Sequence, residues 1–326
     1  MNNSNIWERI KKPVIGLAPM DGVTDEPMRQ IQCSVARPDS ARQAKPDVIY
    51  TEFISAEGFC KKPTAFEKIL FFKENERPVV VQVFGYTPQA FYESISELVK
   101  RGFDGIDINM GCPAKSVIQK GGGGDLIENY SLAEKIILSS FRAIKDSKLN
   151  IALSVKTRIG KNKIITDKWM SFLSELPITE VTVHGRLLNQ ERSGGVYWEE
   201  IKKAGQILKK KNIICLGNGG IKSIKEGASL SIKYGLDGVL IGQAALGNPW
   251  VFKEGYIVSK EDILAIILKH AKLVEAFYTN DRFVTVRKHF GWYPKGFPNC
   301  IKLKTELLKT NNYHEVKSVL DKFRKI

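Results

Sequence analysis

Short apolar runs rich in β-branched residues recur along the first 250 residues and alternate with segments of helical periodicity. The runs that we interpret as strands are residues 14–17, 48–51, 79–83, 105–108, 152–155, 181–183, 213–216 and 238–241. Helical periodicity marks residues 91–100, 132–145, 169–176 and 198–210. These alternating units predict an α/β fold, a (β/α)8 TIM barrel. A doubly wound open sheet is the alternative, but it usually has fewer strands and begins with a GxGxxG turn, which is absent here.

The alternation stops after Asn248-Pro249-Trp250. Helical periodicity then continues through residues 261–278, 282–289, 301–309 and 313–324. We predict a catalytic barrel domain over residues 1–250 and a small C-terminal all-helical domain over residues 251–326, with the connection inside 251–260.

Composition narrows the class of protein. The chain has 326 residues, 43% of them hydrophobic, which is enough for a large core. Its five cysteines form no CxxC pair, which argues against a disulfide framework or a zinc or iron–sulfur site. No apolar run reaches the roughly 20 residues that span a bilayer, and no cationic leader precedes an apolar segment. We expect a soluble, cytoplasmic monomer with no membrane partner.

The charge balance favours a polyanionic partner such as nucleic acid. The formal net charge is +15, and residues 251–326 hold 15 Lys and Arg against 8 Asp and Glu. A lysine-rich composition throughout the chain is the simpler alternative explanation. Charge density is nevertheless highest in the helical part.

Cys112 lies in the stretch Asn109-Met110-Gly111-Cys112-Pro113, directly after the run at 105–108. Pro113 ends strand pairing and Gly111 permits a bend, so we expect the thiol at the carboxyl end of a strand, facing a cleft. An isolated cysteine in such a place is more often an inert small hydrophobe. The other strand ends favour chemistry, because nearly every one carries polar groups or glycine. They are Pro19, Met20, Asp21, Glu52, Gln82, Asn109, Cys112, Lys156, Arg158, His184, Arg186, Asn218, Gly219, Gly220, Gly242 and Gln243.

Several of these residues indicate the kind of ligand. The glycine turns after the seventh and eighth runs lie where TIM barrels usually bind phosphate, although ordinary left-handed turns would also explain them. Lys156 fits either stabilisation of negative charge on a reduced flavin or a Schiff base, and the carboxamide of Gln82 favours the flavin. We expect no metal at this site, because His184 has no second histidine or carboxylate at ligand spacing.

Taken together, these stretches resemble the tRNA-dihydrouridine synthase family over nearly the whole chain. The matching segments are LAPMDGVTD (17–25), TEF (51–53), VQVFG (81–85), NMGCPAK (109–115), VKTR (155–158), VHGR (183–186), GNGGI (217–221), ALGNPW (245–250) and VRKHFGWY (286–293). The resemblance implies an FMN-dependent enzyme that uses NADPH to reduce the C5=C6 bond of particular uridines in tRNA.

The resemblance also implies roles for residues. Cys112 is the general acid that protonates uracil C5. The flavin contacts are Pro19, Met20, Asp21, Gln82, Lys156 and His184, and its phosphate is held by Asn218, Gly219, Gly220, Gly242 and Gln243. Asn109, Arg158 and Arg186 hold the uracil, whereas Arg287 and Lys288 bind tRNA. Further phosphate or stacking contacts are expected from Lys269, Lys272, Arg282, Lys295, Lys302, Lys304, Trp292 and Tyr293.

Some residues depart from the family pattern. Gln243 stands where arginine is usual, Ser116 where lysine is frequent, the loop 33–46 is long, and Gly121–Gly124 form an unusually flexible run. Two other functions stay open on the residues alone: a flavin-dependent oxidoreductase of free pyrimidines, and a non-catalytic RNA-binding protein.

Overall fold

The computed structural model describes residues 5–35, 45–191, 193–278 and 280–324, without the side chains of residues 280 and 281. The chain divides into two compact units. The first comprises Met1–Thr24 and Asp47–Gly242, and the second Asp25–Pro46 and Gln243–Ile326. The functional division at residues 250 and 251 stays a prediction. Most of the long loop at 33–46 lies outside the described residues.

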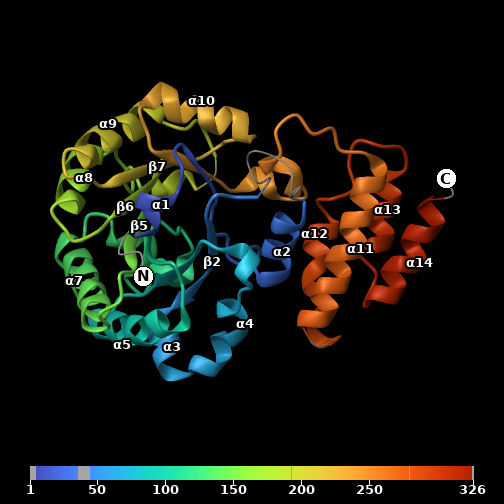
Figure 1. Ribbon diagram of the computed structural model, residues 1–326, viewed down its shortest axis with the longest axis horizontal. Coiled ribbons are helices and arrows are strands. Elements are labelled where there is room, and N and C mark those ends of the chain that lie inside the picture. The colour runs from blue at the N-terminus through green and yellow to red at the C-terminus, as the bar shows by residue number, and fades with distance from the viewer. Residues whose placement is uncertain (1–4, 36–44, 192, 279, 325–326) are drawn as a thin grey trace. The chain divides into compact units, whose positions relative to one another are not determined.

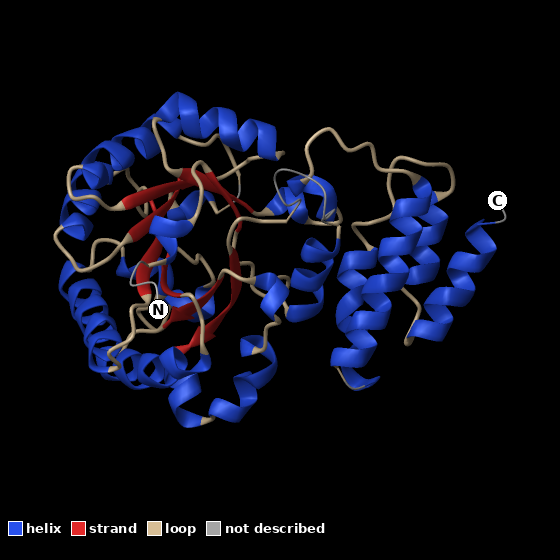
Figure 2. Ribbon diagram, in the orientation of Figure 1, coloured by secondary structure: helices blue, strands red, loops and turns tan. Residues whose placement is uncertain are grey.

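The first unit is a closed barrel of eight parallel strands, as the sequence predicted. The strands are β1 (Val14–Leu17), β2 (Ile49–Ser55), β3 (Val79–Phe84), β4 (Gly105–Met110), β5 (Ala152–Arg158), β6 (Glu180–His184), β7 (Ile214–Asn218) and β8 (Gly238–Ile241). Each strand pairs with the next, and β8 pairs with β1 to close the ring, for example Leu17 with Ile241. Closure excludes the doubly wound alternative. Figure 2 shows the strands enclosed by helices.

Most strands run further than the apolar pattern indicated. β5 continues from the predicted end at residue 155 to Arg158, and β6 and β7 end on His184 and Asn218. The residues added at the carboxyl end of β5 are all polar, and β6 and β7 end on polar residues, whereas β2 and β3 also gain aromatic residues. Strand pairing depends on the backbone, so a change from apolar to polar side chains does not end it.

The helices of this unit lie outside the barrel. They are α1 (Ile6–Arg9), α3 (Ala56–Lys61), α4 (Glu67–Leu70), α5 (Pro88–Leu98), α6 (Lys115–Ile118), α7 (Tyr130–Asp146), α8 (Thr166–Ser174), α9 (Trp198–Lys209) and α10 (Ile224–Tyr234). In Figure 1, α7 to α10 follow the outer side of β5 to β7. The four predicted helices correspond to α5, α7, α8 and α9. Their buried faces join one core with the outward residues of the strands, such as Ile136 and Val155.

The second unit is helical, as predicted. It contains α2 (Glu26–Ser34), α11 (Lys260–Phe277), α12 (Arg287–Phe290), α13 (Cys300–Leu307) and α14 (Tyr313–Arg324). Ile31 of α2 shares a core with Phe290 and residues of α11, α13 and α14. The predicted helix at 282–289 is instead a 3-10 segment, Asn280–Val286, followed by α12. The run Val284-Thr285-Val286 accounts for this difference, because β-branched residues lower α-helix propensity. None of the helices among the described residues is both long and apolar enough to cross a membrane.

Candidate active site

The polar residues predicted at the strand ends meet at one end of the barrel. Strand register pairs Asn109 with Lys156, Arg158 with His184, and His184 with Asn218. Gly242, after β8, lies beside the turn that follows β1, since a Cβ built there would be 3.8 Å from Met20 Sδ. Residues far apart in sequence thus share one rim, where TIM barrels carry their active sites.

A chain of buried hydrogen bonds leads to the Cys112 turn. Gln82 Nε2 donates to Asp107 Oδ2 at 2.6 Å, and Asn109 Nδ2 donates to Gln82 Oε1 at 3.0 Å. Asn109 Oδ1 then accepts the backbone N–H groups of Gly111 (3.1 Å) and Cys112 (3.0 Å). Asp107 is held in turn by Ser154 Oγ at 2.7 Å. An ionised carboxylate only accepts hydrogen bonds, so Asp107 sets the direction of both carboxamides.

Asp107 was not predicted from the sequence as a site residue. The spacing along β4 could have indicated it, because Asp107 and Asn109 are two residues apart and therefore point to the same face of the strand. A buried carboxylate next to a predicted site residue is the pattern that could have identified it.

The four-glycine run packs against the Cys112 turn. Gly124 N donates to the Cys112 carbonyl at 3.0 Å. A Cβ on Gly124 would clash with Leu188 and lie 3.0 Å from the same carbonyl, and one on Gly122 would be 2.7 Å from the Gly85 carbonyl. These glycines permit close backbone approach, so unusual flexibility is not needed to explain them.

Burial raises the pKa of the Cys112 thiol above its ordinary value, and the charge of Asp21 adds to this effect. A backbone hydrogen bond from Ala114 and the charges of Arg158 and Lys156 act in the opposite direction but are weaker. Desolvation disfavours a thiolate, so the thiol keeps its proton at neutral pH. A protonated thiol on a fixed turn is suited to donate a proton.

Lys156 supplies positive charge beside this thiol. Its ammonium group has no hydrogen-bond partner within the described part of the chain. Burial and then the charge of Arg158 lower the pKa of Lys156 to about 8, while Asp107 opposes that shift. Burial raises the pKa of Asp107 to about 6. At neutral pH Lys156 is therefore mainly a cation, and Asp107 mainly a carboxylate.

His184 is a neutral hydrogen-bonding group. Burial and the charges of Lys156, Arg158 and Arg186 hold its pKa well below the ordinary value. Arg186 Nη1 lies 3.5 Å from His184 Nε2 and can only donate, so Nε2 accepts and Nδ1 carries the proton. Nδ1–H is then available to a ligand. Arg186 also donates through Nε and Nη2 to the Gly194 carbonyl.

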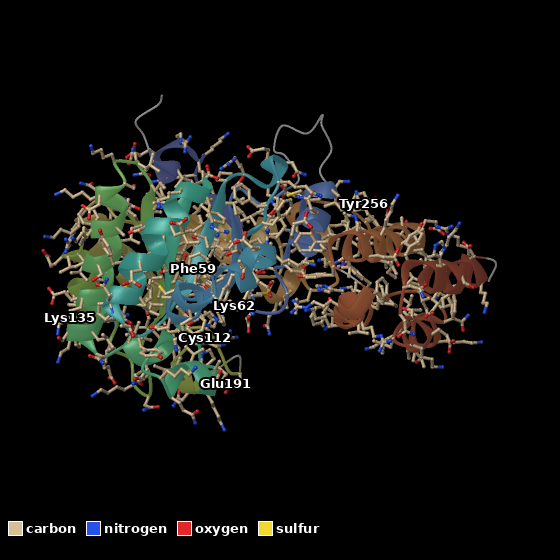
Figure 3. All side chains as sticks on the ribbon, turned by 90° about the horizontal axis from the view of Figure 1, so that it is seen from below. Phe59, Lys62, Cys112, Lys135, Glu191 and Tyr256 are labelled. Carbon is tan, nitrogen blue, oxygen red and sulfur yellow. The ribbon has the colours of Figure 1, made fainter. Side chains whose placement is uncertain are left out.

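Arg158 joins two loops at this rim. Its Nε donates to the Gly111 carbonyl at 2.8 Å, and Nη1 donates to the carbonyls of Leu187 (3.0 Å) and Glu191 (2.9 Å). Figure 3 accordingly shows Cys112 and Glu191 close together. These bonds fix the Cys112 turn from the side opposite Asn109.

In the first of the two turns predicted to bind phosphate, the glycines have positive φ angles. Gly219 and Gly220 have φ values of 125° and 70°, which L-residues rarely adopt. Asn218 Nδ2 donates to the Leu240 carbonyl at 2.8 Å and so ties β7 to β8. Gln243 begins a short 3-10 segment, Gln243–Ala245, in the second unit.

Positively charged side chains lie exposed on the helical unit. The exposed ones among those predicted are Lys269, Lys272, Arg282, Lys295, Lys302 and Lys304. Two nitrogens of the Arg287 guanidinium already donate hydrogen bonds: Nε to the Thr310 carbonyl and Nη2 to Asn311 Oδ1. The stacking role predicted for Tyr293 is wrong, because that side chain is 0% exposed in the core. Trp292 is half-buried.

The sequence was compared with known proteins. A sequence model of the dihydrouridine synthase family matches residues 16–326. The chain belongs to this family. A probable tRNA-dihydrouridine synthase of Staphylococcus aureus (strain COL) is 33% identical over 98% of this chain and 95% of its own. Probable tRNA-dihydrouridine synthase 2 of Bacillus subtilis (strain 168) is 30% identical over 98% of this chain and 97% of its own.

The fold has a similar solved structure. The old yellow enzyme homologue from Zymomonas mobilis superimposes with a TM-score of 0.51 at 13% identity, covering 79% of this chain and 96% of that one. At that identity the likeness supports the fold of this family member and nothing further.

The raised thiol pKa predicts slow, alkaline titration of Cys112. In a variant lacking the other four cysteines, the rate of alkylation by iodoacetamide should rise with pH to a midpoint above that of a small free thiol. Lys156→Met should move the midpoint higher, because it removes a nearby positive charge. A midpoint below neutral pH would contradict the protonated thiol.

The direction of the amide chain predicts a specific effect of Asp107→Leu. The apolar side chain cannot accept from Gln82, so Gln82 and Asn109 lose the contact that fixes their direction and can release the Cys112 backbone. We expect a loss of about 1–3 kcal/mol in unfolding free energy and severalfold faster alkylation of Cys112. Ser154→Ala is the matched control, since it leaves the Gln82 contact in place. Equal alkylation rates in Asp107→Leu and the wild type would exclude this positioning role.

Proposed function

We propose that this protein is an FMN-dependent tRNA-dihydrouridine synthase that uses NADPH to reduce the C5=C6 bond of specific uridines. The observation that carries the proposal is the half-buried thiol of Cys112 on a turn fixed by Asn109 and Arg158, with Lys156 on the neighbouring strand paired with Asn109. The relatives named as probable tRNA-dihydrouridine synthases support the choice of substrate. We place the reaction in the cytoplasm and the protein there as a monomer.

The residues at the rim fit FMN. A Cβ at Gly242 would have no neighbour closer than 3.6 Å, and one at Gly220 none closer than 3.5 Å, so neither backbone is crowded by a neighbouring group. Their N–H groups, with those of Gly219 and Gln243, are the proposed phosphate donors, and Asn218 holds the turn. Gln243 lacks the charge of arginine, so this phosphate depends more on backbone donors.

Other residues of the barrel would hold the isoalloxazine ring. Gln82 has one N–H and one lone pair left for the pyrimidine edge, because Asp107 and Asn109 use the others. The Lys156 ammonium would stabilise negative charge, and His184 Nδ1–H would donate to the cofactor. Pro19, Met20 and Asp21 would line its other side.

When bound and reduced by NADPH, FMN supplies a hydride from N5 to uracil C6. Cys112 gives its thiol proton to C5, so the former double bond gains two hydrogens, and the resulting thiolate regains a proton from solvent. Asn109 and Arg158 hold Cys112 in place, and Asn109, Arg158 and Arg186 are the proposed uracil contacts. A uridine stacked in tRNA must be swung out to reach this site.

The direct test is to incubate the protein with NADPH and unmodified tRNA, digest the RNA and analyse it by mass spectrometry. We expect a uridine heavier by two hydrogens at a defined position. Product formed from free uracil or uridine but not from tRNA would support a free-pyrimidine oxidoreductase. Binding of tRNA without product by flavin-loaded protein would support a binding-only role.

Cys112→Ala should keep flavin and tRNA binding but lose about 100-fold or more of its turnover, because proton donation at C5 is removed. The measurement is the single-turnover rate of dihydrouridine formation, with NADPH-dependent flavin reduction recorded alongside. Cys300→Ala is the matched control and should react at the wild-type rate. Normal turnover by Cys112→Ala would exclude the cysteine as the acid.

The proposed tRNA surface predicts that Arg287→Glu combined with Lys288→Glu weakens tRNA binding by about tenfold or more at low salt. Flavin content should not change, because neither residue is among the proposed flavin contacts. Lys135→Glu makes the same kind of change on the exposed face of α7, which Figure 3 marks, and should have little effect. An unchanged tRNA affinity in the double variant, with its helical content preserved, would rule out this surface.

A further inference from the structure

Three buried side chains of the helical unit converge in a way that the proposed reaction does not use. Asp25 is the N-cap of α2, His270 lies in α11, and His289 lies in α12. One potential ligand atom from each lies within 4.8 Å of the other two. The side chains are 6%, 0% and 1% exposed. Segments distant in sequence therefore bring two imidazoles and a carboxylate together in the interior.

The imidazoles lack hydrogen-bond partners at this point. His270 Nε2 and both ring nitrogens of His289 are buried and unpaired among the described residues. An unpaired buried polar atom costs about 1–3 kcal/mol, and such atoms are rare in folded proteins unless water or an ion fills the space between them. One nitrogen of each ring can face the Asp25 carboxylate, and unpaired nitrogens beside this carboxylate indicate an occupant.

The surrounding groups orient His270 and Asp25 as a metal site requires, whereas neither ring nitrogen of His289 has a hydrogen-bond partner among the described residues. His270 Nδ1 lies 2.9 Å from the Tyr293 hydroxyl, and when Nδ1–H donates to it the lone pair of Nε2 faces the cluster. Asp25 accepts from Met28 N at 3.0 Å through Oδ1 and from the Tyr278 hydroxyl at 3.3 Å through Oδ2. Ligating histidines and carboxylates are usually held by such outer hydrogen bonds.

The positive charge of Lys288 acts on the Asp25 carboxylate and opposes a second cation. A metal ion bound directly by that carboxylate would nevertheless supply the missing partner for one nitrogen of each imidazole.

The geometry points to a structural site for one divalent transition-metal ion of the zinc type, bound by Asp25, His270 and His289. Two nitrogens and one oxygen are ligands typical of zinc, and water can complete the tetrahedron. Zinc–ligand bonds of about 2.0–2.2 Å require the three side chains to rotate slightly inward. The ion would join the start of α2 to α11 and α12. This inference does not depend on the proposed reaction or on the barrel site.

From the sequence, a metal site was not expected near His184, and nothing was predicted for the helical unit. The three residues proposed here are too widely separated in the chain for ligand spacing to reveal them, and only the folded helices bring them together.

The first test measures metal content. Full-length protein, purified without a metal column and with its thiols alkylated, is loaded with Zn²⁺, washed and analysed by plasma mass spectrometry. We expect about one zinc per chain in the wild type and much less in His289→Gln and His270→Asn. His314→Ala removes an exposed histidine of α14 and should retain the ion. Zinc should also raise the melting temperature of the wild type, because it binds the folded state.

The second test keeps the ligands and changes an outer contact. Tyr293→Phe removes only the hydroxyl that orients His270, so it should weaken zinc binding by about 10–100-fold. Co²⁺ substitution should give the weak visible bands of a nitrogen and oxygen site, without thiolate charge transfer. Wild-type protein that retains less than about a tenth of an ion per chain, or histidine variants that bind zinc as the wild type does, would overturn the proposal and leave water as the occupant.

Discussion

The ionised carboxylate of Asp107 can only accept hydrogen bonds, and this fixes the polarity of the chain that ends at Cys112. A carboxamide by itself can face either way. Because Asp107 takes Gln82 Nε2, the oxygen of Gln82 must face Asn109, and the oxygen of Asn109 must face the backbone of Cys112. One buried charge thus determines where the thiol points and which atoms of Gln82 are left for a ligand.

Low solvent access explains the remaining properties of the barrel rim. Desolvation disfavours every charged form, so it keeps the Cys112 thiol protonated and His184 neutral. Lys156 keeps most of its charge at neutral pH, although burial lowers its pKa to about 8. The rim therefore offers the cation of Lys156, a neutral donor on His184 and the proton of Cys112, next to the guanidinium groups of Arg158 and Arg186. That combination suits a reaction in which negative charge develops on a ring while a carbon is protonated.

The fold was largely predictable from the sequence. All eight strands could be located, and so could α5, α7, α8, α9, α11, α13, α14 and part of α12, because apolar periodicity reports directly on burial. The other described helices, α1 to α4, α6 and α10, were not predicted. The carboxyl ends of the strands were less visible, since pairing continues into polar residues such as Arg158. The irregular start of α12 follows from the β-branched run at 284–286, whereas the burial of Tyr293 depends on packing between helices, which periodicity does not resolve.

The residues of the candidate site could be predicted from the sequence, but the contacts between them could not. Positions after each strand identified Cys112, Lys156 and His184. The role of Asp107, the clamp formed by Arg158 and the close approach of Gly124 to Cys112 required coordinates, because each is a contact between different strands or loops. The cluster of Asp25, His270 and His289 is a further example, as its members lie in three separate helical segments.

The proposed function requires electrons to pass from a bound flavin to a uridine of tRNA. The most direct measurement is anaerobic mixing of the pre-reduced protein with unmodified tRNA while flavin absorbance is followed. We expect the flavin to be re-oxidised, with about one dihydrouridine formed for each flavin oxidised. Reduced flavin that persists in the presence of tRNA, or that is oxidised equally fast by free uridine, would contradict it.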